Sequence, residues 1–278
     1  MLLKAPWNER NGRFSPLKAV VFAALFAPAL YILWRFESGA LAPKPVTEMI
    51  HRTGDWAVRL LLLSLLITPL RKLAQWPKLI AVRRMVGVAA FAYAFAHFCL
   101  YIVDQKFDLL HVASEIVLRF YLTIGFVTLL GLLALSISST DGWMRRLGPR
   151  WKKLHRLAYP LTVLALFHYY LQSKADVSAA VFVTGLFAWE MIWRVTPRAS
   201  RLQLWPLPLI AVAAAVATAL IEMAWYGLAT RIDPIQVLEA NLDLSYGPRP
   251  AVTVLLCGLV LCVIAWIRRW RQNRVVAA

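Results

Sequence analysis

The sequence predicts an all-α, polytopic membrane helix bundle with about eight transmembrane helices. Hydrophobic residues make up 60% of the 278 residues and only 16% are charged, whereas about a quarter of an ordinary soluble domain is charged. The apolar residues stand in long runs, without the spacing of amphipathic helices or half-buried strands. The three cysteines have neither the number nor the spacing of a disulfide framework or a metal site. We therefore expect the chain to lie within a lipid bilayer.

A spanning helix needs roughly 20 mainly apolar residues. Eight runs reach or nearly reach that length: Leu17–Trp34, Trp56–Leu70, Met85–Val103, Ile116–Ile137, Leu154–Leu171, Val177–Trp193, Leu204–Leu228 and Ala251–Ile267. The second run is short, and it reaches spanning length if His51–Asp55 form a polar first turn. Pro28 and Pro160 lie inside the first and fifth runs, where a proline could break the helix.

The basic residues predict the orientation of the chain. There are 31 Lys and Arg residues against 14 Asp and Glu residues, a formal net charge of +17. A soluble protein this basic would suggest nucleic acid as a partner, but here the basic residues gather in the N-terminus, the tail and alternate connections. Cytoplasmic loops of membrane proteins have this pattern. We therefore expect both termini in the cytoplasm, the connections 104–115 and 172–177 outside, and no nucleic-acid partner.

Histidines are the main candidates for chemistry in the membrane. The sequence contains no Gly-rich phosphate loop and no His-Glu-x-x-His motif. His51 and His111 fall near the outer ends of runs two and four, where interfacial histidines need no further role. His97 and His168 lie inside apolar runs, and ionisable residues at that position are costly and usually functional.

His97 and His168 are expected at the same depth, in the outer half of the bilayer. His97 precedes the end of its run at Val103 by roughly 9 Å along the helix. His168 precedes the end of its run at Leu171 by roughly 4–5 Å. Two histidines on different helices at one depth can bind a haem iron from both faces. The same placement also allows a pair of core histidines hydrogen-bonded across helices.

His155 precedes His168 by thirteen residues, which puts it about 140° away around an ideal helix. A second haem bound by two histidines would need a histidine near position 84, and Arg84 stands there. His155 could therefore bind a haem with an unidentified partner, hydrogen-bond a flavin or quinone, or contact lipid headgroups.

Several segments together resemble a known family. They are Thr53-Gly54-Asp55-Trp56-Ala57, Thr68-Pro69-Leu70-Arg71, Arg83-Arg84-Met85-Val86-Gly87, Tyr93–His97, Ser138–Trp143, Arg146-Leu147-Gly148, Trp151–Tyr159 and His168. The most specific is the Trp-x-x-Leu-His-Arg-Leu stretch, whose His155 stands thirteen residues before His168. Across residues 15–195, the sequence resembles the MsrQ family. These are the haem-binding membrane subunits of the periplasmic protein-methionine-sulfoxide reductase system, within the ferric-reductase-like transmembrane group.

The resemblance implies a subunit of the bacterial inner membrane that takes electrons from quinol, or from a cytoplasmic flavin reductase. The flavin reductase is the donor in some members, and the electrons would pass through haem b and could also pass through FMN. The acceptor would be a periplasmic molybdenum-cofactor methionine-sulfoxide reductase that repairs oxidised exported proteins. This chain has no catalytic centre for that reaction, so no catalytic residue is assigned to it.

The family's cofactor-binding residues match five positions of this sequence: His97, His155, His168, Arg83 and Arg84. His97 and His168 are the expected ligands of the haem iron. The two arginines could bind a flavin phosphate or haem propionates through paired hydrogen bonds, or could simply be cytoplasmic anchors.

Two features depart from the family pattern. Arg119-Phe120-Tyr121 replaces the usual Arg-Pro-Tyr, so we expect a straighter start to that span. Residues 196–278 add two spans beyond the family's usual end, for packing, oligomer contacts or partner docking. The expected organisation is a cytoplasmic N-terminus at 1–15, a six-span haem-binding core at 16–195 and this extension.

Two other functions remain open from the residues. One is a b-type cytochrome or ferric reductase with another acceptor. The other is a non-redox transporter or scaffold, although a transporter would more often show an internal repeat, and no convincing repeat is recognised.

Overall fold

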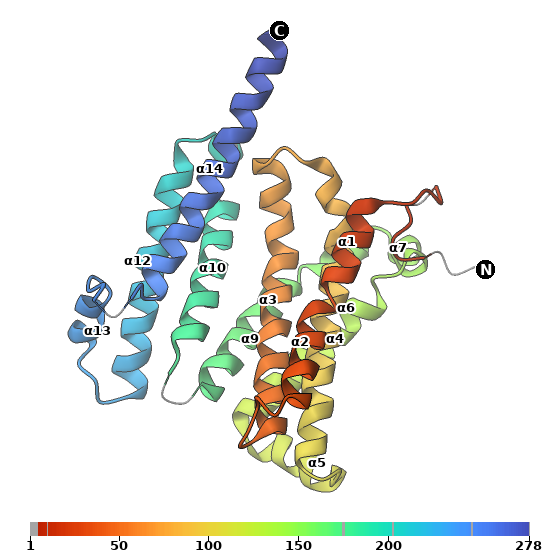
Figure 1. Ribbon diagram of the computed structural model, residues 1–278, viewed down its shortest axis with the longest axis vertical. Helices are drawn as coiled ribbons and strands as arrows, with labels where there is room; N and C mark the ends of the chain where they lie inside the picture. The colour runs from red at the N-terminus through yellow and green to blue at the C-terminus, as the bar shows by residue number, and fades with distance from the viewer. Residues whose placement is uncertain (1–4, 10, 174–175, 202, 246, 278) are drawn as a thin grey trace. The chain divides into compact units, whose positions relative to one another are not determined.

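The structure is a computed structural model that describes residues 5–9, 11–173, 176–201, 203–245 and 247–277. In these residues the chain folds into helices without a strand element (Figure 1). The helices are α1 Pro16–Ala24, α2 Ala27–Glu37, α3 Pro45–Leu73, η1 Pro77–Leu79, α4 Ile80–Asp104, α5 Leu109–Leu118, α6 Phe120–Ile137, α7 Asp141–Leu147, α8 Pro149–His155, α9 Ala158–Gln172, α10 Ser178–Val195, α11 Arg198–Arg201, α12 Pro206–Ala229, α13 Pro234–Ala240 and α14 Pro250–Ala277.

Seven helical segments of the described chain are long and apolar enough to cross a membrane. They are Pro16–Glu37, Pro45–Leu73, Pro77–Asp104, Phe120–Ile137, Ser178–Val195, Pro206–Ala229 and Pro250–Arg271. They confirm the predicted polytopic helix bundle. The remaining predicted span corresponds to α9, which is apolar but has only 15 residues.

Two compact units make up the chain. The first contains the residues up to Ser64 together with Ile80–His168, and the second contains Leu65–Leu79 with the chain from Tyr169 onward. Helices α3 and α9 therefore contribute residues to both units.

The first predicted span is interrupted between α1 and α2 at Pro28. Proline has no N–H and disrupts the helical hydrogen bonds around it. The Tyr93 hydroxyl of α4 fills the gap, accepting from the Ala29 N–H at 3.0 Å and donating to the Leu25 carbonyl at 2.8 Å. In a continuous helix, Ala29 and Leu25 would bond directly. Tyr93 thus satisfies backbone groups that have no water partner in a bilayer.

The chain also breaks at Arg119, which has extended backbone angles between α5 and α6. The expectation of a straighter helix start is therefore wrong. The Thr123 hydroxyl donates to the Ile116 carbonyl at 2.5 Å and so replaces a helical N–H donor. The Arg119 side chain pairs with Glu115 at 2.5 Å and contacts the Tyr121 hydroxyl at 3.1 Å. These side-chain contacts stabilise the break without a proline.

The fifth predicted span begins later than expected. Residues 149–155 form the separate helix α8, and α9 begins only at Ala158. Pro160 lies in the first turn of α9, where its ring is tolerated but would not fit a helix continuing from α8. His155 therefore lies outside α9, and the angle expected from one ideal helix does not apply to it.

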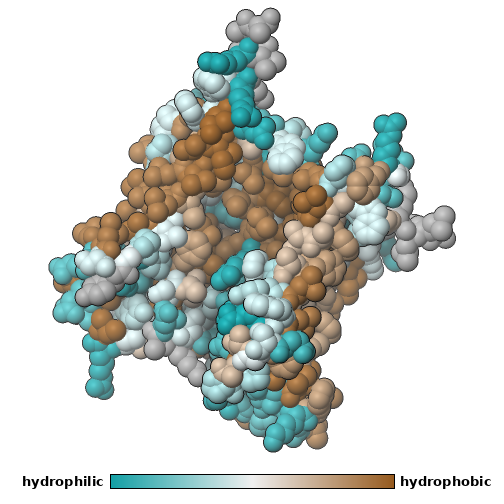
Figure 2. All heavy atoms as spheres, viewed as in Figure 1, coloured by the Kyte–Doolittle hydropathy of each residue, from teal (hydrophilic) through white to brown (hydrophobic). Residues whose placement is uncertain are grey.

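Helices α10, α12 and α14 of the second unit pack side by side (Figure 1). Small residues allow the close approach: a Cβ added to Gly185 would lie 2.2 Å from Thr218 Oγ1, and one added to Gly258 would lie 2.6 Å from Ala211 Cβ. Close packing at small residues is typical of helix pairs in membranes. Figure 2 shows apolar side chains along the outward face of α14 and hydrophilic ones at its end.

Candidate functional site

His97 of α4 and His168 of α9 lie next to each other in the first unit. Their ring centroids are 6.3 Å apart, and the two ring planes are inclined by 84°. The two histidines placed at one depth by sequence are thus brought together from different helices.

Both imidazoles are held by the same kind of contact. Nδ1 of His97 lies 2.8 Å from the Ile50 carbonyl oxygen of α3, and Nδ1 of His168 lies 2.8 Å from the Tyr121 carbonyl oxygen of α6. A carbonyl oxygen can only accept, so we assign the N–H to Nδ1 in each ring. Nε2 then carries a lone pair, as in a metal-binding histidine whose other nitrogen is hydrogen-bonded. Within the described residues, neither Nε2 has a hydrogen-bond partner.

A glycine allows each ring to lie against the neighbouring helix. A Cβ added to Gly54 would lie 3.0 Å from Nδ1 of His97, and one added to Gly125 would lie 2.7 Å from Cε1 of His168. Each glycine comes one helical turn after the carbonyl that holds the ring. Any larger residue would displace the imidazole or the helix.

The sequence interpretation missed these glycines and carbonyls, although a signal for them exists. Each histidine follows its carbonyl partner by 47 residues, and each partner is followed four residues later by a glycine. The segments from Ile50 to His97 and from Tyr121 to His168 are therefore equivalent in spacing. The prediction that the chain has no recognisable repeat missed this local correspondence.

This donor set fits a haem iron. A metal–imidazole nitrogen bond is about 2 Å, so two imidazoles on opposite sides of one metal have ring centres roughly 6 Å apart, close to the observed 6.3 Å. Phe98 and Phe167 directly follow and precede His97 and His168, respectively, in the sequence. Phe98 packs on Phe126 at 5.7 Å between centroids, and Phe120 packs on Phe167 at 6.4 Å.

His155 has protein partners on both ring nitrogens. Nδ1 lies 3.2 Å from the Trp151 carbonyl, and Nε2 lies 3.2 Å from the Ser139 hydroxyl. The ring also stacks on Trp151, with centroids 3.9 Å apart. Burial lowers the pKa of His155, and the nearby Arg83 charge lowers it further. Both ring nitrogens of His155 are thus engaged by the protein at the end of α8.

The two adjacent arginines make different contacts. Nε of Arg83 donates to the Ser64 carbonyl of α3 at 3.2 Å. Arg84 forms an ion pair with Asp141 of α7, in which both side chains are about half exposed, and its Nη1 lies 3.6 Å from Met144 Sδ. Only Arg83 lies close to His155. His51 and His111 are exposed, and their place at the membrane interface stays a prediction.

Known proteins resemble the chain across this region. Residues 53–166 match a family model described as ferric reductase like transmembrane component. A protein of Xanthomonas campestris pv. campestris (strain 8004) is 43% identical over 190 residues, covering 66% of this chain and 87% of the relative. One of Caulobacter vibrioides (strain ATCC 19089 / CIP 103742 / CB 15) is 38% identical over 178 residues, covering 63% and 85%. Both are named protein-methionine-sulfoxide reductase heme-binding subunit MsrQ.

The chain belongs to the MsrQ family. As an MsrQ family member with seven apolar helices, it is a multi-pass protein of the bacterial inner membrane. The matched segment includes Gly54, His97, Gly125 and His155, and ends two residues before His168. No solved structure matches the chain.

Proposed function

We propose that this MsrQ family member is a membrane electron-transfer subunit that binds haem b between His97 and His168. The observation that carries the proposal is the imidazole pair, with both Nδ1 atoms on backbone carbonyls and ring centroids 6.3 Å apart. The relatives' printed name, heme-binding subunit, supports the same cofactor.

Haem b bound by two imidazoles would supply a one-electron carrier without an open coordination position. The protein's contribution is to hold the two histidine rings in the orientation that binding needs. The Ile50 and Tyr121 carbonyls select the tautomer that leaves Nε2 free, and hydrogen bonds of this kind raise ligand basicity. Gly54 and Gly125 let the rings reach these carbonyls.

The proposed acceptor is a methionine-sulfoxide reductase, specifically a periplasmic molybdenum-cofactor enzyme. The relatives' names support a reductase partner, and the absence of a catalytic centre for sulfoxide reduction requires one. The proposed donor is the quinone pool or a cytoplasmic flavin reductase. Both termini would lie in the cytoplasm, as the distribution of basic residues indicates. Docking would be weak and transient, as is usual for electron-transfer encounters.

A second cofactor region is proposed at the cytoplasmic end, where Arg83 lies near His155. Arg83 and Arg84 could bind an FMN phosphate or haem propionates, and His155 could hydrogen-bond the same group. Residues 16–195 would form the haem-binding core and 196–278 an extension of it.

Reoxidation of the purified, dithionite-reduced protein tests this function. The cognate periplasmic reductase together with methionine sulfoxide should reoxidise the haem, whereas neither should do so alone. Failure with both present would reject the proposed acceptor. Because the matched model describes ferric reductases, a ferric chelate is the second acceptor to test. Reoxidation by the chelate alone would favour the ferric-reductase alternative.

A further inference from the structure

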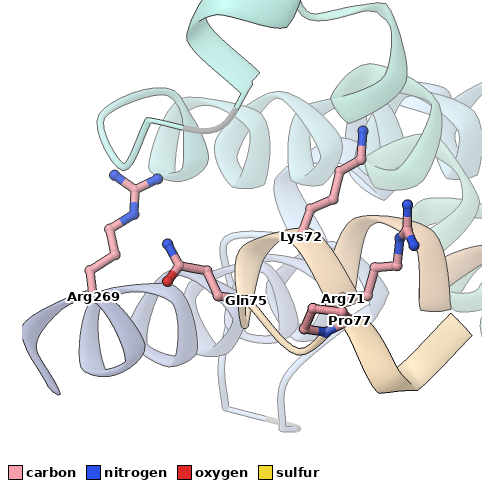
Figure 3. A pocket seen from close by; sticks show the side chains of 5 residues that line it. All are labelled: Arg71, Lys72, Gln75, Pro77 and Arg269. Atoms are coloured by element: carbon pink, nitrogen blue, oxygen red, sulfur yellow. The ribbon is translucent and has the colours of Figure 1, made fainter. Parts of the chain in front are cut away.

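A basic cavity lies in the second unit. It measures about 410 Å³ and is lined by Arg71, Lys72, Gln75, Pro77 and Arg269. Figure 3 shows the polar side chains from the end of α3 and the arginine from α14 extending to the same side of these helices. None of the described lining residues is acidic.

The positive charges in this cavity are not neutralised by the protein. In the described part of the chain, neither Arg71, Lys72 nor Arg269 forms an ion pair, and Nε of Arg71 is buried without a hydrogen-bond partner. The other cavity, in the first unit, differs in this respect: it also has basic residues, but Glu48 lines it and pairs with Arg52 at 3.5 Å. An external anion could therefore bind here without competing with an acidic side chain of the described lining.

Helix α3 ends next to this cavity in a backbone conformation that residues other than glycine rarely adopt. Helix α3 ends with hydrogen bonds from Trp76 N–H to the Arg71 carbonyl at 2.9 Å and from Gln75 N–H to the Lys72 carbonyl at 3.3 Å. This ending places Gln75 in the left-handed region, with φ of 48°, where glycine is usual. A glutamine there supplies an amide to the cavity that glycine would lack.

Lipid headgroups are expected at the ends of spanning helices, and the cavity lies at two such ends. The spans Pro45–Leu73 and Pro250–Arg271 both end beside it. Tryptophans characteristic of the membrane interface accompany these ends. Arg268 lies 6.0 Å from the Trp76 ring centroid, and the Lys72 ammonium lies 5.8 Å from that of Trp193.

We propose that this cavity binds the phosphate group of an anionic phospholipid. Arg71, Lys72 and Arg269 would balance the phosphate charge, and the Gln75 amide would donate to a phosphate oxygen. The acyl chains would lie along the apolar outward face of α14, where Leu259, Val263 and Trp266 are exposed. A soluble phosphate compound has the same phosphate chemistry but no acyl chains to contact that face.

Lipid binding to the full chain in neutral detergent tests the proposal. Native mass spectrometry would compare cardiolipin with phosphatidylcholine for the wild-type protein and for an Arg71→Gln/Lys72→Gln/Arg269→Gln variant. We expect the wild type to prefer cardiolipin by roughly tenfold or more, because each basic group near a headgroup adds to binding. The variant should lose this preference. The single variant Arg269→Gln, near the end of α14, should reduce the preference for cardiolipin in part. It replaces the triple variant in the test if the triple variant does not fold.

A matched control removes three exposed charges that do not line the cavity, with Lys78→Gln/Arg198→Gln/Arg271→Gln. This control should keep the wild-type preference. Equal loss in the control would show that surface charge alone attracts the lipid, and would overturn the proposed site. Inorganic phosphate is the second probe. A rise in the midpoint of thermal unfolding as large with phosphate as with cardiolipin would reject the lipid in favour of a soluble anion.

Discussion

Gly125 and Gly54 control how closely the two histidine rings approach their backbone partners. Gly125→Ala would place a methyl group 2.7 Å from Cε1 of His168, whereas Gly54→Ala would place one 3.0 Å from Nδ1 of His97. We expect Gly125→Ala to reduce haem affinity by about tenfold, the lower range for losing an outer hydrogen bond to a metal ligand. Gly54→Ala should have a smaller effect. The haem content per protein, measured as the pyridine haemochrome, tests both expectations.

Gly87→Ala is the matched control, because it lies in α4 like His97 and its Cβ would meet only Ser64 Cβ at 3.9 Å. It should retain the wild-type haem content. Full retention by Gly125→Ala would show that the packing of the ring against this glycine does not position the ligand.

For individual residues, the sequence predicts the two histidines but not the backbone carbonyls that hold their rings. An ionisable side chain inside an apolar run stands out on composition alone, and helical rise gives the depths of His97 and His168. The Ile50 and Tyr121 carbonyls are backbone groups that every residue has, so no residue type marks them. Arg84 illustrates the same limit. Its partner Asp141 lies 57 residues away, and only the fold brings them together.

Tyr93 joins the interrupted helix pair α1–α2 to α4. Tyr93→Phe would leave the Ala29 N–H and the Leu25 carbonyl without the hydroxyl that bridges them. We expect the free energy of unfolding to fall by roughly 1–3 kcal/mol, the cost of an unsatisfied buried polar group. Denaturant unfolding in detergent measures this change.

Tyr31→Phe provides the comparison, because Tyr31 of α2 is 48% exposed, its hydroxyl lies 3.5 Å from Arg35 Nη1, and its ring, which the substitution keeps, contacts Trp34 and the Arg35 guanidinium. It should leave stability nearly unchanged. A Tyr93→Phe protein as stable as the wild type would mean that the helix break is satisfied in another way.

Helix breaks were predictable only where proline causes them. Pro28 and Pro160 both mark interruptions, because proline cannot supply the helical hydrogen bond. The break at Arg119 depends instead on Thr123 and Glu115 replacing backbone contacts. Such residues are also common inside continuous helices, so the sequence pattern favours an unbroken span there.

We predict the orientation of the whole molecule from the distribution of basic residues, and this prediction has a direct test. Single cysteines at Asp108→Cys and Asp176→Cys should react with a membrane-impermeant maleimide added outside spheroplasts. Because Cys99, Cys257 and Cys262 are partly exposed, they are first replaced by serine. An Arg150→Cys protein, with the cysteine at the second position of α8, should react only after the membrane is opened. Labelling of Asp108→Cys only after opening would invert the orientation and place the acceptor on the wrong side.

The central claim is that His97 and His168 together hold haem b, and the dithionite-reduced absorption spectrum of the purified protein tests it most directly. The wild type should show a haem α-band. His97→Ala and His168→Ala should each lose most of it, because each removes one of the two proposed iron ligands. His51→Ala and His111→Ala, at exposed positions, should keep the wild-type spectrum. Absence of the band from wild-type protein made in haem-replete cells would contradict the claim. Loss of the band in His155→Ala with its retention in His168→Ala would do so as well.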